Sequence, residues 1–195
     1  MADLTTLRRS PLEHLSDRLR TAAVTGNRAV SVREVPFLTM VSLRVQPGSA
    51  AAARIGDFLG APLPQTVGEV SAAGALWLGP DEWLVVSESG PTSVVAGLRE
   101  ALGTDPGSVV DVSANRTTLE LSGPSARAVL EKGCPVDLHP RSFRPGRAVA
   151  TTLGPVPLVL WQTGEDTYRL LPRSSFADYA ARWVVDATTE FAAPE

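Results

Sequence analysis

The chain has 195 residues, 44% of them hydrophobic, which is enough to bury one sizeable core but short for two independent domains. A formal net charge of −3 and a pI near 5.5 give no electrostatic support for binding nucleic acid or an anionic membrane surface. A single cysteine, Cys134, excludes an internal disulfide, and two histidines are too few for a Cys/His metal cluster.

The distribution of apolar residues predicts a cytoplasmic protein. The N-terminus lacks an apolar segment of signal-peptide length. No run approaches the ~18 to 20 apolar residues that a membrane span needs. A reducing compartment is the simplest interpretation of one cysteine.

Residues 1–35 precede the repeated part of the chain. Ser10 as a cap, Pro11 at the first helical position and Glu13 in a capping box predict a short helix. Its apolar face comprises Leu12, Leu15 and Leu19, and an alternating segment with Val30, Val32 and Val35 follows. This segment either packs on its own domain or forms an arm, residues 1–35, that lies on a partner protein.

The first structural unit begins with alternating residues 41–45. Pro47, Gly48 and Ser49 then turn the chain into a helix over residues 50–59, which Gly60 ends. Residues 76–86 indicate a hairpin with a Pro-Asp turn, and a helix over residues 92–102 follows.

A second unit repeats this order. Residues 117–121 alternate, residues 122–125 turn, and residues 126–131 form a helix that Ser125 can cap and that Lys132 and Gly133 end. A hairpin follows over residues 156–161 and 168–171, and a last helix opens at Ser174 or Ser175. The offset between the units grows along the chain, so we interpret the repeat as structural duplication.

These elements predict an α+β fold of two pseudo-duplicated split β-α-β units with antiparallel sheets and packed helices. We expect one domain over residues 36–187, with a first repeat at about 37–103, a second at about 117–187 and a frayed tail at 188–195. Between the repeats, residues 108–116 predict a short strand and a polar turn. There, Asp111 and Ser113 can bond the turn backbone and Asn115 tolerates positive φ; a catalytic Asp111 is the alternative.

The other candidates for chemistry have structural interpretations. His14 has no carboxylate partner visible in the sequence, His139 precedes a proline, and Cys134 fits a buried position. Three arginines could bind an anion or an acidic patch of a partner, or remain solvated: Arg141, Arg144 and Arg147. The tryptophans favour core packing: Trp77, Trp83, Trp161 and Trp183. Nucleotide-binding, zinc-protease and serine-hydrolase motifs are absent. We therefore assign no catalytic, cofactor-binding or metal residue.

Four stretches occur in a fixed order: RRSPLEHL, LWLGPDEWLVV, DVSANRTTLELSGPSARAVLEKGCPVDLHPRSF and DTYRLLPRSSFADYAARWV. Together they resemble the gamma subunits of bacterial heterotetrameric sarcosine oxidase over nearly the whole chain. Gamma in turn resembles the folate-binding domain of glycine-cleavage aminomethyltransferases, whose S-G-x-x-A turn matches residues 122–126.

The resemblance implies an enzyme that oxidatively demethylates sarcosine to glycine, with hydrogen peroxide and either formaldehyde or methylene-tetrahydrofolate as products. It implies that FAD, FMN, NAD and tetrahydrofolate belong to the two larger subunits and zinc to the smallest, with none on this chain. The expected role is a scaffold that contacts the alpha, beta and delta subunits, chiefly alpha.

Two other functions stay open at this point. One is a stand-alone folate-binding protein of the same fold, which would need a carboxylate aimed at the pterin in an aromatic-lined cavity. Lys132-Gly133-Cys134 matches the K-G-C of that fold's iron–sulfur-linked branch, but Pro135 follows in place of the expected tyrosine. The other is an assembly factor for a different enzyme.

Overall fold

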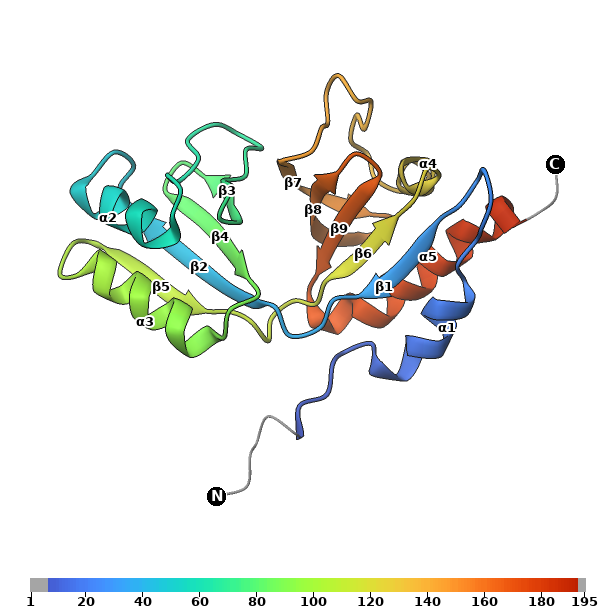
Figure 1. Ribbon diagram of the computed structural model, residues 1–195, viewed down its shortest axis with the longest axis horizontal. Coiled ribbons are helices and arrows are strands. Elements are labelled where there is room, and N and C mark those ends of the chain that lie inside the picture. Colours follow the sequence, from blue (N-terminus) through green and yellow to red (C-terminus); the bar gives the residue numbers. More distant parts are fainter. Residues whose placement is uncertain (1–6, 193–195) are drawn as a thin grey trace.

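Two antiparallel sheets form the centre of the computed structural model, which describes residues 7–192, and the helices cover their outer faces (Figure 1). The sheets have four and five strands. This arrangement confirms the predicted α+β class. No helix within residues 7–192 combines the length and the apolar character that crossing a membrane requires.

The four-stranded sheet has the order β3-β4-β2-β5 and contains the first repeat. Its strands are β2 (Thr39–Val45), β3 (Ala75–Gly79), β4 (Glu82–Ser87) and β5 (Gly107–Asp111). Its helices are α2 (Ala50–Leu59) and α3 (Pro91–Leu102). The Ser49 side chain caps α2 by accepting a hydrogen bond from Ala52 N–H at 3.2 Å, and, as predicted, Gly60 ends the helix, with φ of 81°.

The five-stranded sheet has the order β1-β6-β9-β8-β7. Its strands are β1 (Ser31–Glu34), β6 (Leu119–Ser122), β7 (Arg147–Leu153), β8 (Val156–Gly164) and β9 (Thr167–Pro172). Its helical segments are η2 (Glu13–Leu15), α1 (Ser16–Thr21), α4 (Ala126–Glu131), η3 (Ser174–Phe176) and α5 (Ala177–Ala192). Every predicted element of the second repeat is present, and β7 is an additional strand between α4 and β8.

The N-terminal segment completes the second repeat. β1 pairs antiparallel with β6, just as β5 pairs with β2. The two strands occupy equivalent positions in their repeats, but β1 precedes its repeat in the chain and β5 follows its repeat. The apolar residues of the segment lie in the core of the second repeat: Leu12, Leu15, Leu19, Val30 and Val32. The structure favours packing on its own domain over a separate arm, because a boundary at residue 35 would cut through this core.

Several local expectations need correction. The helix predicted from Pro11 begins as a 3-10 turn at Glu13, and the Ser10 hydroxyl donates to Glu34 in β1 rather than capping the helix. Ser125 makes no side-chain capping hydrogen bond to α4. The expected frayed tail is wrong for residues 188–192, because α5 continues to Ala192 with Phe191 buried; residues 193–195 lie outside the described part.

A central apolar cluster joins the two repeats. It comprises Leu38, Met40, Leu76, Leu84, Val86, Ala148, Val159 and Leu171, contributed by both sheets. The segment containing Glu69 and Val70 bridges the sheets, since Glu69 pairs with Arg147 of β7 and Val70 with Leu76 of β3. The two repeats therefore share one packed interior between their sheets, in addition to a core under each set of helices.

Candidate functional site

The single cysteine is buried at the end of α4. Cys134 is only 5% exposed, and burial raises the pKa of its thiol from 9.0 to about 11. The reactive form of cysteine is the thiolate, so this thiol is unreactive near neutral pH. Lys132 of the K-G-C sequence donates to the Ala187 carbonyl at 2.6 Å and pairs with Glu190 at 2.9 Å, which ties α4 to α5. The interpretation of Cys134 as a buried residue is confirmed.

His14 has a carboxylate partner that the sequence could not reveal. Its Nε2 lies 2.8 Å from Oδ1 of Asp178 in α5, and Asp178 also accepts a hydrogen bond from Arg182 Nε at 2.7 Å. These contacts, with that from Arg182 the stronger, lower the pKa of the Asp178 carboxyl. All three side chains are about half exposed. The cluster links the N-terminal segment to α5.

Asp111 stabilises the crossing from the first repeat to the second. Its Oδ1 accepts hydrogen bonds from the hydroxyl and the backbone N–H of Ser113 at 2.6 and 2.9 Å, and these lower the pKa of the Asp111 carboxyl. Ser113 Oγ in turn accepts from Met40 N–H at 3.0 Å. The structural turn is confirmed, but Asn115 does not use a positive φ; among the described non-glycine residues only Phe37 does.

The tryptophans pack as predicted, to different depths. Trp83 is 1% exposed and donates from Nε1 to the Pro64 carbonyl at 2.8 Å. Trp77, Trp161 and Trp183 are partly buried, and each packs against a different one of the three apolar clusters. The sequence correctly indicated core packing for all four.

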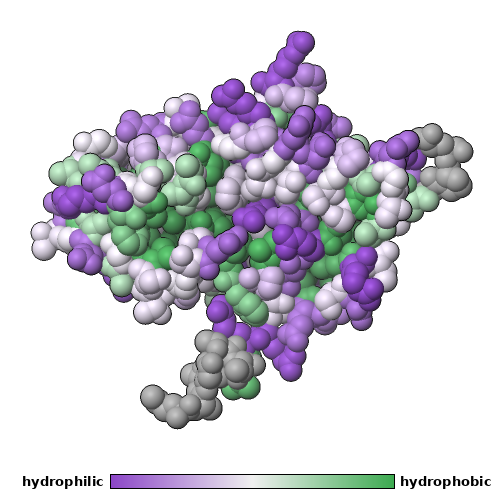
Figure 2. Space-filling model, in the orientation of Figure 1, coloured by the Kyte–Doolittle hydropathy of each residue, from purple (hydrophilic) through white to green (hydrophobic). Residues whose placement is uncertain are grey.

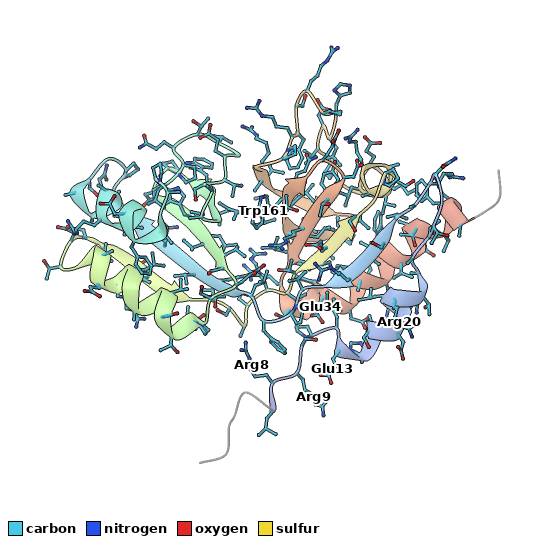
Figure 3. All side chains as sticks on the ribbon, in the orientation of Figure 1. Arg8, Arg9, Glu13, Arg20, Glu34 and Trp161 are labelled. Atoms are coloured by element: carbon cyan, nitrogen blue, oxygen red, sulfur yellow. The ribbon has the colours of Figure 1, made fainter. Side chains whose placement is uncertain are left out.

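A row of charged residues crosses the five-stranded sheet and was not singled out from the sequence. Glu120 of β6 pairs with Arg33 of β1 on one side and, at 3.1 Å, with Arg169 of β9 on the other. The Arg169 guanidinium also lies 5.4 Å from the centre of the Trp161 ring, which lies between the two repeats (Figure 3). One carboxylate is thus shared by two cations. The strand register that aligns the three side chains could not be read from the sequence.

A second charged group lies along the N-terminal segment. Arg9 pairs with Glu13 at 2.7 Å, and Arg20 lies further along on α1 (Figure 3). Glu34 accepts hydrogen bonds from Ser10 and, at 2.7 Å, from the Thr117 hydroxyl. Exposed ion pairs of this kind contribute about 0–1 kcal/mol each. The two hydrogen bonds to Glu34 attach the segment to β1 and β1 to the chain before β6.

Two surface grooves of the described chain have different linings. A groove of about 550 Å³ runs along α2 and is lined mainly by small and apolar residues. A groove of about 790 Å³ lies between residues 62–71 of the first repeat and the loop before β7, where Arg144 and Arg147 line it. Within residues 7–192, no three His, Cys, Asp or Glu side chains are grouped as metal ligands.

Comparison with known proteins identifies the family. The model of the sarcosine oxidase gamma subunit family matches residues 45–190. The chain belongs to this family. It is 48% identical to the sarcosine oxidase gamma subunit of Corynebacterium sp. (strain U-96), covering 100% of this chain and 97% of the relative. It is also 48% identical to that of Arthrobacter sp., covering 100% and 96%. The family resemblance read from the sequence is confirmed.

Solved structures agree with this membership of the gamma subunit family. A chain of the heterotetrameric sarcosine oxidase from Corynebacterium sp. U-96, in complex with pyrrole 2-carboxylate, matches with a TM-score of 0.93 and 48% identity over 97% of this chain and 98% of that chain. The glycine cleavage system aminomethyltransferase T from Bartonella henselae matches with a TM-score of 0.64 and 17% identity over 92% of this chain and 57% of that one. The second likeness concerns the fold alone and confirms the predicted fold relationship.

Proposed function

We propose that this chain is a non-catalytic scaffold subunit of a heterotetrameric sarcosine oxidase in the cytoplasm. The observation that carries the proposal is its full-length match, at 48% identity and a TM-score of 0.93, to a chain of such an enzyme. In this proposal the FAD, FMN, NAD, tetrahydrofolate and zinc belong to other subunits, and the alpha subunit is the principal contact among alpha, beta and delta.

The chemistry of the described residues supports a structural role. The Cys134 thiol is protonated near neutral pH, and Asp111 and Asp178 are held by hydrogen bonds that order the chain. These interactions stabilise the fold and do not prepare the three groups for a reaction.

The surface supports a role in assembly. Large hydrophobic side chains between 41% and 71% exposed are spread over both repeats: Leu7, Phe37, Phe58, Val67, Val110, Phe176 and Tyr179. Permanent subunit interfaces commonly bury ~2,000 Å² or more and are rich in such side chains. We expect part of this set to be covered in the tetramer.

The test is native mass spectrometry and a visible spectrum of what co-purifies with the chain, tagged at its C-terminus, from its own host. We expect a yellow assembly of four different chains that oxidises sarcosine. A colourless monomer that binds added tetrahydrofolate would refute the subunit function and support a stand-alone folate-binding protein. Four chains that assemble without oxidising sarcosine would support an assembly role for another enzyme.

A further inference from the structure

The loop between α4 and β7 projects beyond both sheets yet has a defined internal structure (Figure 1). Phe143 anchors it in the core of the second repeat with 5% exposure. The His139 carbonyl accepts hydrogen bonds from the backbone N–H of Ser142 and Phe143 at 2.8 and 2.9 Å, and Asp137 Oδ1 accepts from His139 N–H at 3.0 Å. The side chains that the loop carries are therefore presented from a fixed backbone.

Two arginines of this loop and Arg147, the first residue of β7, have no acidic partner within residues 7–192. Seven other arginines of residues 7–192 form ion pairs: Arg9, Arg20, Arg33, Arg44, Arg54, Arg169 and Arg182. In the same part of the chain, Arg141, Arg144 and Arg147 have no carboxylate within ion-pair distance. The protein is acidic overall, with a net charge of −3, so this loop is a local concentration of unneutralised positive charge. Figure 2 shows hydrophilic side chains gathered on the projection.

Two of these arginines line the groove between the repeats. Arg147 is held in place because its guanidinium lies against Gly68, where a Cβ would be 2.9 Å from Nη2. The groove, of about 790 Å³, is otherwise walled by the Pro62–Gln65 stretch, Pro145 and the bridging residues near Val70. The lining therefore combines apolar and polar side chains with two guanidinium groups, and Glu69 is its acidic residue.

We propose that this groove docks an extended, acidic segment of a partner subunit, whose carboxylates pair with Arg144 and Arg147. The inference rests on the proposed function, which supplies the partner. Guanidinium groups match carboxylates in bidentate geometry and are favoured at subunit interfaces. The groove is open and lies between residues 62–71 and the loop before β7, which leaves room for a chain segment, and the two guanidinium groups require that segment to be acidic.

The test uses the intact complex, assembled around the tagged parent chain or the variants Arg144→Glu, Arg144→Lys and Arg18→Glu. Arg18 of α1 is the matched control, since it is also exposed and without an acidic partner among the described residues. We expect Arg144→Glu to weaken assembly by about tenfold or more and to reduce its salt dependence, because a close charge pair becomes a repulsion. We expect Arg144→Lys to retain most of the affinity and Arg18→Glu to match the parent. Circular dichroism melts verify that all variants fold.

Assembly of Arg144→Glu as tight as that of Arg18→Glu would overturn the inference while leaving the proposed function intact. Failure of the parent chain to assemble with any other subunit would overturn the proposed function and the inference with it. Calorimetry with inorganic phosphate tests whether the groove binds a small anion instead. Phosphate binding that Arg144→Glu abolishes, with assembly unchanged, would identify a small-anion site and overturn the docking of a partner segment.

Discussion

Removing residues 1–34 should unfold the second repeat rather than only weaken association. Five apolar side chains of this segment are at most 5% exposed: Leu12, Leu15, Leu19, Val30 and Val32. Burying one such side chain contributes about 1.5–3 kcal/mol, so together they contribute roughly 8–15 kcal/mol. This is comparable to the ~5–15 kcal/mol that stabilises a whole domain. Loss of β1 would also leave one edge of β6 without a partner.

A pair of single substitutions tests the same reasoning without removing the strand. Leu19→Ala should cost ~2–5 kcal/mol, which corresponds to a fall in Tm of roughly 4–20 °C for a chain of this size. Leu7→Ala is the control, because Leu7 is 71% exposed, and its Tm should stay within about 1 °C of the parent value. Both are measured by circular dichroism melts. A truncated chain that melts cooperatively at the parent Tm would refute the reasoning and restore a separable arm.

Three further predictions concern buried positions. Thr118→Val should leave the unfolding free energy unchanged or raise it, since the buried Thr118 hydroxyl has no hydrogen-bond partner among residues 7–192. Thr117→Val should lower it by about 1–2 kcal/mol in urea titrations, because the Thr117 hydroxyl donates a hydrogen bond to the Glu34 carboxylate of β1. Gly133→Ala should lower it by about 1–3 kcal/mol, because the new Cβ would lie 2.4 Å from the Trp183 ring; an unchanged value would contradict the packing. The Cys134 thiol should resist iodoacetamide at pH 7.5 until urea unfolds the chain. The pKa of this thiol rises from 9.0 to about 11 on folding. The free energy of unfolding of the parent should therefore fall, relative to that of Cys134→Ala, by up to about 3 kcal/mol as pH rises from 9 to 11. A pH-independent difference would refute the shift.

Local signals in the sequence determined the helices and hairpins of both repeats. The bounds of α2 and α4 match the predicted residues 50–59 and 126–131, because a turn, an apolar face and a stop signal all lie within about a dozen residues. The spacing of Leu12, Leu15 and Leu19 correctly gave one buried face, although the regular helix starts only at Ser16. For the candidate groove, the sequence singled out the arginines of the loop but could not place residues 62–71 opposite them.

Tertiary structure alone determined which segments and side chains, distant in the sequence, pair with one another. The fourth strand of the second repeat comes from residues 31–34, and β7 forms because Arg147–Leu153 pairs with β8 although its own alternation is weak. The pairing of His14 with Asp178 and the sharing of Glu120 by two arginines depend on helix docking and strand register. Local sequence encodes backbone preference and which face is apolar, whereas the packing of two cores and one shared interior selects which remote segments meet.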